Sequence, residues 1–509
     1  MPMSSQFTRR DFLKLSTLLP FLSVKWTDPQ GRQTRTDPET PNVFILVFDA
    51  LSATNASLYG YRRETTPNLT RFAERATVYH DHHAGGNFTT PGTASLLTGS
   101  YPWSHRAFNT NGTVAERFKK QNIFSAFGEK GYFRSAYSHN LLAVALLYQF
   151  LADIEDFTRA RELCFVDDEI SDRIFFGDYN NAFFAETLMM HGSGTKPGSL
   201  FLSFLHRFVR AYHKREITAD YGKLFPRGIP NLHNLYFILE QAIDWIMTKV
   251  ETLPQPYLAY YHLLPPHEPY MTRREFIGRF ADGWAPETKK PMPLGGRQGA
   301  PEEYLARSRV EYDEYLAYAD AEFGRLYDFM MENGTLDNTI FVFTSDHGEM
   351  FERGIRGHVT QALYEPITHV PLMISIPGQK ERQDVYTPTS CTDLLPTLLH
   401  LTGQSAAGWT EGKLLPKLGG EDIPHDAYTM EARSNPKAAP ITKATLSLVS
   451  GGYKMINYLG YNPGESIFEL YDLKKDPEER ENIAALDKNV LTGLQSALEA
   501  KIKAANHKA

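Results

Sequence analysis

The sequence has only two cysteines, Cys164 and Cys391, among 509 residues. This scarcity excludes a disulfide-rich scaffold and a zinc or iron–sulfur site built from several cysteines, and leaves open one disulfide in an oxidising compartment. An excess of positive charge is also lacking: 53 Lys and Arg stand against 60 Asp and Glu, a net charge of −7. No basic field therefore favours nucleic acid. Since no run of 18 apolar residues occurs, several membrane spans are not expected.

What is present is typical of a globular protein, with 42% hydrophobic and 22% charged residues. The length allows about three domains, or one large domain with a smaller satellite. We divide the chain into an export signal (1–26), a linker (27–41), a catalytic domain (42–404) with an insertion at about 140–250, and a smaller C-terminal domain (405–509).

The N-terminal segment reads as an export signal. Arg9 and Arg10 precede Phe-Leu-Lys and an apolar stretch at 15–24, which resembles the twin-arginine signal. We therefore expect export by that route to a periplasmic or extracytoplasmic location. The cleavage region lacks a small-x-small pattern, so an uncleaved signal could act as a membrane tether.

Three apolar runs predict strands that are buried on both faces of an α/β sheet. Residues 42–48 (NVFILVF) end at Asp49, residues 340–343 lead to Asp346 and His347, and residues 257–264 (YLAYYHLL) lead to His267. Sites in open α/β sheets form past the carboxyl ends of the strands. Helical spacing is found at 235–250, at 310–331 and, as a closing helix, at 490–504, after short strands that begin near residue 405.

Carboxylates combined with an imidazole suit a divalent metal ion, so Asp49, Asp346 and His347 are candidate ligands. The alternative is that each strand-end aspartate merely caps a helix. Thr89 belongs to a group of small hydroxyl residues that precede a helix-like stretch (93–97) ending at Gly99. Its hydroxyl suits either a helix cap or a nucleophile beside the anion-binding N–H groups of a helix N-terminus.

Taken together, these segments resemble the sulfatase family of the alkaline phosphatase superfamily. The resemblance covers 41 to about 482, and its pieces occur in the order of the family. They are residues 41–49, 58–61, 66–69, 89–99, 101–102, 267–270, 337–349, 363–372, 393–399 and 469–477. It implies a central mixed, mostly parallel sheet flanked by helices, as in alkaline phosphatase, with a smaller C-terminal α+β domain.

The resemblance also implies site residues. One divalent ion (Zn, Mn, Ca or Mg) would be held by Asp49, Thr89, Asp346 and His347, and the histidine favours Zn or Mn over Ca. His267 would contact the ester oxygens or protonate the leaving group; simple packing beside two prolines is its alternative. His358 would be a basic contact to substrate, and His139 and Asn140 stand near another basic position of the family.

The sequence departs from the family at the nucleophile. Sulfatases carry Cys or Ser where this chain has Thr89, and threonine cannot become formylglycine because its β-carbon bears a methyl group. Ala50 replaces a second aspartate, and Gly92 and Thr93 replace the usual Ser and Arg. Threonine is the nucleophile in the related lipoteichoic acid synthases and phosphoethanolamine transferases. A metal-activated Thr89 is therefore expected.

Three functions remain open. The first is a metal-dependent phosphoesterase or phosphotransferase that uses Thr89, and the second is a sulfuric ester hydrolase in the broad sense with unmodified Thr89. The third is a catalytically reduced binding protein that retains the fold. The substrate would be a small-molecule, glycan or lipid ester rather than a nucleic acid.

Overall fold

The computed structural model describes residues 40–110, 112–165, 200–232, 235–287, 289–293, 299–423, 425–462 and 465–507. These belong to one compact unit that spans 37–509. The predicted export signal, nearly all of the linker and residues 166–199 of the predicted insertion lie outside the described residues. Among the helices that are described, none has the length and hydrophobicity needed to cross a bilayer.

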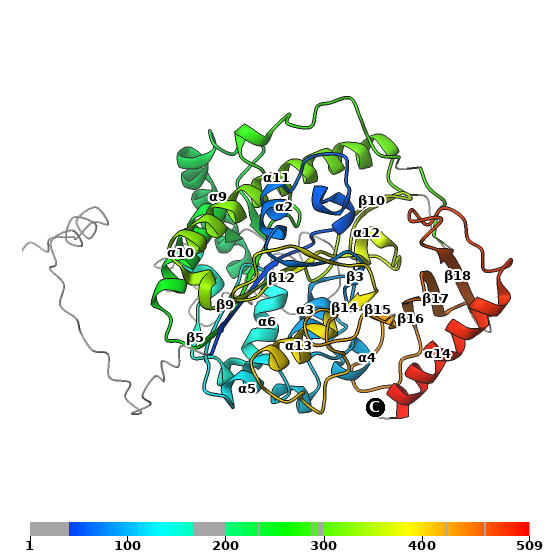
Figure 1. The fold of residues 1–509 in the computed structure, drawn as a ribbon. Coiled ribbons are helices and arrows are strands. Elements are labelled where there is room, and N and C mark those ends of the chain that lie inside the picture. Colours follow the sequence, from blue (N-terminus) through cyan, green and yellow to red (C-terminus); the bar gives the residue numbers. More distant parts are fainter. Residues whose placement is uncertain are drawn as a thin grey trace, which may run out of the picture. The chain divides into compact units, whose positions relative to one another are not determined.

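The core of this unit is an eight-stranded sheet (Figure 1). Its strand order is β13 (Gln383–Val385), β2 (Thr77–Tyr79), β12 (Leu372–Ser375), β9 (Thr339–Thr344), β1 (Asn42–Phe48), β8 (Tyr257–Leu263), β4 (Phe133–Ser138) and β5 (Asp156–Phe157). Strands β9, β1, β8, β4 and β5 run parallel, and β12 pairs antiparallel with both β9 and β2. The predicted mixed, mostly parallel sheet is thus confirmed.

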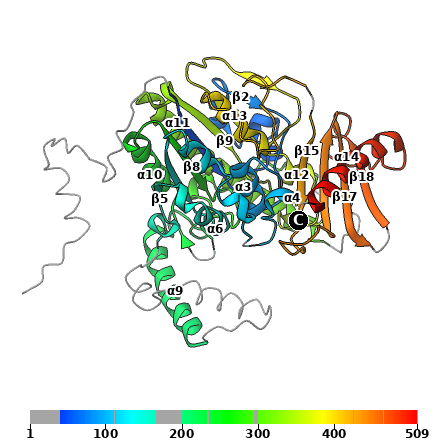
Figure 2. The same cartoon turned by 90° about the horizontal axis from the view of Figure 1, so that it is seen from below.

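Strand β1 is buried along its whole length and feeds two hydrophobic cores. Phe44, Leu46 and Phe48 join one core, whereas the alternate residues Val43 and Ile45 join the other. This alternation is the two-residue period of a strand. The helices that supply the first core are α2 (Pro67–Ala73), α10 (Leu239–Thr252) and α11 (Glu302–Glu332); those of the second are α3 (Thr89–Thr98), α5 (Ile123–Gly128), α6 (Leu141–Gln149) and α13 (Leu394–Leu401). Figures 1 and 2 show these helices as layers around the sheet.

Most predicted elements are found close to their expected bounds, with two corrections. The long helix predicted at 310–331 begins earlier, at Glu302 of α11. The helix predicted at 235–250 starts later than expected. Leu235–Tyr236 instead forms strand β7, which pairs with β6 (Asn231–Leu232). A backbone hydrogen bond from Phe237 to Pro230 extends this hairpin, so that α10 starts only at Leu239. One long helix elsewhere is α9 (Leu200–Tyr221). Short elements are α4 (Pro102–His105), β3 (His82–His83), β14 (Thr389–Ser390), β10 (Met350–Glu352), β11 (Ile355–Gly357) and α12 (Glu365–Thr368).

The C-terminal part is a smaller antiparallel sheet with one long helix. Strands β15 (Ala427–Glu431), β16 (Ala444–Ser450), β17 (Tyr453–Asn462) and β18 (Glu465–Asp472) are consecutive neighbours, followed by α14 (Lys488–His507). Lys454 of β17 is completely buried and lies 2.8 Å from Glu365 and 2.9 Å from Glu479. The predicted smaller C-terminal domain is confirmed as an architecture, and its boundary at residue 405 stays a prediction.

The two cysteines are not paired with each other. Cys391 is buried in the second core, and burial raises the pKa of its thiol to about 12. Such a thiol is protonated and unreactive at neutral pH. It therefore behaves as a small hydrophobic side chain.

Candidate active site

The carboxyl ends of four parallel strands bring polar side chains to one edge of the sheet. Asp49 follows β1, Asp346 follows β9, His262 lies near the end of β8, and Asn140 follows β4. Adjacent parallel strands end at the same edge, so residues up to 297 positions apart become neighbours. All four are at most 1% exposed. The predicted strand-end site is therefore enclosed within the protein.

Asp49 is completely buried among hydrogen-bond donors and imidazoles. Its Oδ2 accepts a hydrogen bond of 2.5 Å from Asn140, and its Oδ1 lies 3.3 Å from His347 Nε2. Although burial opposes it, the imidazoles of His267, His262 and His347 hold the pKa of Asp49 well below its usual range. Asp49 is thus an anion, ready to bind a cation.

Ala50 adopts the left-handed backbone conformation, with φ of +60°. This conformation is strained for alanine and costs roughly 1–3 kcal/mol, which neighbouring contacts must offset. The carbonyl oxygen of Ala50 accepts a hydrogen bond of 2.8 Å from Tyr312, and its N–H points at Asp346 Oδ1, 3.4 Å away. The bend directs the chain away from the site immediately after Asp49.

Thr89 is the first residue of α3, and its side chain is 1% exposed. Its hydroxyl does not cap the helix; instead Oγ1 lies 2.9 Å from the amide nitrogen of Asn140 and 3.5 Å from His347 Nε2. Free N–H groups at the start of a helix attract anions. The hydroxyl and this anion site therefore coincide, which is the arrangement that a nucleophile needs.

Asp346 and His347 complete the anionic centre. The His347 Nε2 lies 3.7 Å from Asp346 Oδ2, and its Nδ1 lies 3.0 Å from the carbonyl oxygen of Gly348. Burial lowers the pKa of His347, but the charges of Asp346 and Asp49 outweigh it and raise the pKa to about 9. A cation placed among these groups would compete with this proton.

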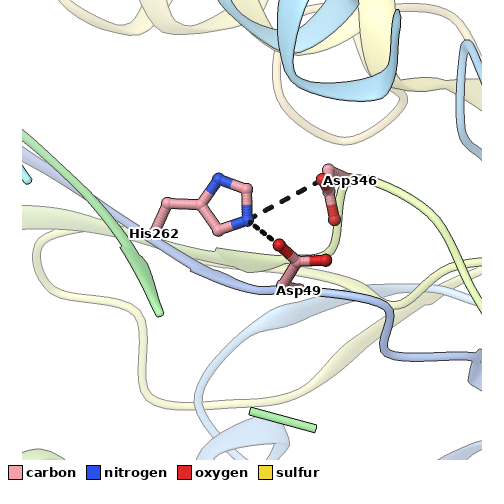
Figure 3. A group of neighbouring side chains, drawn as sticks. All are labelled: Asp49, His262 and Asp346. Atoms are coloured by element: carbon pink, nitrogen blue, oxygen red, sulfur yellow. Dashed lines mark ion pairs between the residues drawn. The ribbon is translucent and has the colours of Figure 1, made fainter. Parts of the chain in front are cut away.

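His262 was not among the residues that the sequence predicted for the site. It lies in β8, and its Nε2 is 3.2 Å from Asp49 Oδ2 and 3.7 Å from Asp346 Oδ2 (Figure 3). Within an apolar run, a histidine reads as a buried strand residue. The signal that could have found it is its polarity in a strand that is otherwise buried and apolar.

Asn140 was predicted only to stand near a basic position of the family, and the structure places it inside the site. Its Nδ2 donates to both Asp49 and Thr89, while its Oδ1 accepts from the N–H of Leu142 and caps α6. His139, by contrast, stacks on Phe237 with ring centroids 4.2 Å apart. Burial lowers the pKa of His139 to about 3, so it is a neutral packing residue.

His267 and His358 lie beside the anionic centre. Their ring centroids are 4.8 Å apart, and the ring of His358 lies 4.3 Å from that of His347. The Nδ1 of His358 lies 3.2 Å from both carboxylate oxygens of Glu349. Burial raises the pKa of Glu349 to about 8 and lowers that of His358 well below its usual value. His267 Nδ1 lies 2.6 Å from the carbonyl oxygen of Glu268.

Two departures from the family pattern have a structural reason. A Cβ on Gly92 would lie 2.1 Å from the carbonyl oxygen of Asp346, so α3 approaches the end of β9 too closely for any side chain there. Thr93, in place of arginine, has its hydroxyl 3.3 Å from Asp346 Oδ2 and donates to it. These residues therefore fit the site rather than marking its decay.

Comparison with known proteins identifies the family. A family model described as "Sulfatase" matches residues 41–404, and one described as "N-sulphoglucosamine sulphohydrolase, C-terminal" matches residues 358–508. The first match covers more than half of the chain, so the chain belongs to the sulfatase family.

Curated relatives and solved structures agree with this membership. The chain is 24% identical to a choline-sulfatase of Rhizobium meliloti, over 87% of this chain and 82% of the relative. It is 25% identical to an ulvan-active sulfatase of Formosa agariphila, over 92% and 81%. A phosphonate monoester hydrolase of Agrobacterium radiobacter has the same fold, with a TM-score of 0.66, 20% identity, and 92% and 96% of the chains covered.

The family generally uses a divalent metal ion, and the residues present fit one. Asp49, His262 and Asp346 each offer a ligand atom, and these atoms lie within 4.8 Å of one another. Asp49 Oδ1 and His262 Nε2 are buried without a hydrogen-bond partner among the described residues. Buried polar atoms are almost always paired, so these two atoms fit the ligand set of a divalent cation.

Proposed function

We propose that this protein is a metal-dependent hydrolase of phosphate or sulfate esters, within the alkaline phosphatase superfamily, in which Thr89 is the nucleophile. The observation that carries the proposal is the position of Thr89. Its hydroxyl stands at a helix N-terminus, 2.9 Å from Asn140 and 3.5 Å from His347, beside the carboxylates of Asp49 and Asp346. A hydroxyl that served only as a cap would bond its own helix instead.

In this proposal Asp49, Asp346, His347 and Thr89 hold the ion. A divalent cation bound there would lower the pKa of the threonine hydroxyl and neutralise charge on the transferring group. The two imidazoles near the carboxylates favour Zn or Mn over Ca. Asn140 orients the hydroxyl, because its amide donates to the Thr89 oxygen and leaves the hydroxyl proton free to depart.

The reaction would then proceed in two displacements. The Thr89 hydroxyl would lose its proton to solvent, Oγ1 would attack the phosphorus or sulfur, the bond to the leaving alcohol would break, and the departing oxygen would take a proton from His267. A water molecule would next attack the Thr89 ester, give one proton to His267, and release phosphate or sulfate together with the Thr89 alkoxide, which regains a proton from solvent. An acceptor alcohol in place of water would give group transfer.

Relatives support esters as the substrate class. The curated relatives named above are a choline-sulfatase and an ulvan-active sulfatase. Sulfate esters are therefore one candidate class of substrate. Phosphate esters are favoured by the threonine, because it cannot be oxidised to formylglycine. A small-molecule or glycan ester fits both candidates.

A substrate panel tests the proposal. Purified protein is supplied with Zn or Mn and assayed on nitrophenyl phosphate, a nitrophenyl phosphodiester and nitrophenyl sulfate, alongside Thr89→Ala. We expect metal-dependent turnover of a phosphate or sulfate ester that is lost in the variant, with a covalent ester trapped on Thr89 by mass spectrometry. Turnover that survives the substitution contradicts the nucleophile, and no turnover on any ester favours the reduced binding protein.

We also propose that the protein works outside the cytoplasm. Support comes from the twin-arginine segment at 8–14, which lies outside the described residues. Changing Arg9 and Arg10 to lysine should keep the protein in the cytoplasmic fraction of expressing cells. An unchanged distribution between fractions would refute this route.

A further inference from the structure

His262 is a buried histidine whose inward nitrogen has no hydrogen-bond partner among the described residues. Its side chain is completely buried, and Nε2 lies 3.2 Å from Asp49 Oδ2 without the alignment of a hydrogen bond. The same nitrogen lies 3.7 Å from Asp346 Oδ2. Figure 3 shows the ring edge directed at both carboxylates. An orphaned nitrogen at this place, between two carboxylates, needs an explanation.

The Tyr260 hydroxyl contacts the outer ring nitrogen of His262. Its oxygen lies 3.2 Å from His262 Nδ1. When Nε2 offers its lone pair to a cation, the neutral imidazole carries its hydrogen on Nδ1 and donates it to Tyr260. Thr93 donates its hydroxyl proton to Asp346 Oδ2.

His262 Nε2 then has two possible states. In the neutral imidazole, Nε2 holds a lone pair that faces two carboxylate oxygens, and the contact is repulsive unless a cation lies between them. In the imidazolium, Nε2 carries a second hydrogen and pairs with the carboxylates. A fixed hydrogen on the outer ring nitrogen is also how metal-binding histidines are oriented in general.

We propose that His262 Nε2 is a ligand of the divalent ion, and that it takes the place of the carboxylate that Ala50 lacks. This inference rests on the proposed function for the presence of the ion. Tyr260 and Thr93 are then positioning residues, since they act on the ion only through His262 and Asp346. The chain thus replaces an oxygen ligand by a nitrogen ligand from the neighbouring strand.

The distances fit such an ion. With His262 the ion would have five ligands, and bonds of about 2.1 Å in a five-coordinate site put adjacent ligand atoms roughly 3.0–3.6 Å apart. The distances of 3.2 and 3.7 Å from His262 Nε2 to the two carboxylates lie close to this range. Octahedral Mg, with bonds of about 2.0–2.1 Å, would require about 2.9 Å. Since an imidazole also suits Zn and Mn better than Ca, the site should select Zn or Mn.

Metal affinity in the absence of substrate tests the proposal. The apoprotein is titrated with Zn against a chromophoric chelator, in the wild type, His262→Gln and Tyr260→Phe. We expect His262→Gln to weaken Zn binding by about 100-fold or more, and Tyr260→Phe by about 10-fold or more, because it frees the tautomer. Tyr261→Phe is the matched control: it removes a hydroxyl from the same strand, but one bonded to Ser135, and should not change the affinity.

X-ray absorption of the Zn-loaded protein gives an independent count of ligands, with one imidazole fewer expected in His262→Gln than in the wild type. Equal Zn affinity and equal imidazole count in wild type and His262→Gln would overturn the proposal and identify His262 as an imidazolium. Tyr260→Phe keeps the test valid if His262→Gln fails to fold. Failure of the proposed function looks different, because it appears as lost ester turnover in a wild-type protein that still binds Zn.

Discussion

The amide nitrogen of Asn140 lies 2.9 Å from the hydroxyl oxygen of Thr89. Because the same nitrogen also donates to Asp49, Asn140 fixes the nucleophile relative to a metal ligand. Asn140→Ala should lower kcat by about 100-fold, the cost of one oriented donor in an active site. It should leave KM nearly unchanged, as steady-state kinetics on the best ester would show.

A helix cap is lost in the same variant, so the control must lose one too. Asn122 caps α5 in the same way and donates to no residue of the site. Asn122→Ala should cost about 1 kcal/mol of stability and leave kcat unchanged. Equal losses of kcat in both variants would assign the effect of Asn140 to folding.

The hydroxyl of Thr89 should be indispensable, whereas its methyl group should not. Thr89→Ser is expected to stay within about tenfold of wild-type kcat, and Thr89→Ala to fall by at least about 10³-fold, since the covalent step is lost. Thr90→Ala is the control, because the buried Thr90 hydroxyl has no partner among the described residues. An inactive serine variant would contradict this assignment.

Gly92 should tolerate no side chain. In Gly92→Ala the new Cβ would meet the Asp346 carbonyl oxygen at 2.1 Å, so either α3 or the end of β9 must shift. We expect a loss of about 1–3 kcal/mol in urea unfolding, together with weaker Zn binding. Gly493→Ala lies in α14, and its new Cβ would meet no atom of the described residues within 4 Å apart from its own helix backbone, so it should instead stabilise the protein by up to about 1 kcal/mol.

Stability should fall at alkaline pH because of His83. Its Nε2 lies 2.6 Å from Asp81, and although burial lowers the pKa of His83, the Asp81 carboxylate raises it above its usual value. This contribution is fully present below about pH 6.5 and is lost as pH rises through the folded-state pKa. Urea unfolding from pH 6 to 9 should show the decline, and Asp81→Asn should flatten it.

Lys454 should be essential for folding. Lys454→Met would leave Glu365 and Glu479 buried without their cation, which typically costs about 3–5 kcal/mol. Thermal unfolding should show a large drop in Tm. Lys475→Met, which removes an exposed lysine in the turn after β18, should leave Tm almost unchanged.

The sequence predicts a strand and its site residue well where the strand is apolar and the residue that follows it is charged. The run 43–48 is uniformly apolar and is followed by a charge, so both the strand and Asp49 could be predicted. Strand β4 reads FRSAYS, a polar pattern that conceals a buried strand, and Asn140 beyond it could not be placed. His262 was missed because distances between strands depend on register, and register depends on contacts that one sequence does not specify.

The buried Lys454 has a consequence for synthesis. Glu365 is made 89 residues before the lysine that neutralises it, so a nascent chain holds an unpaired acid until β17 has left the ribosome. A fragment that ends near residue 404 would keep that acid permanently. Expression of the catalytic part alone should therefore yield a protein that aggregates or is degraded, although the sequence offers that position as a natural boundary.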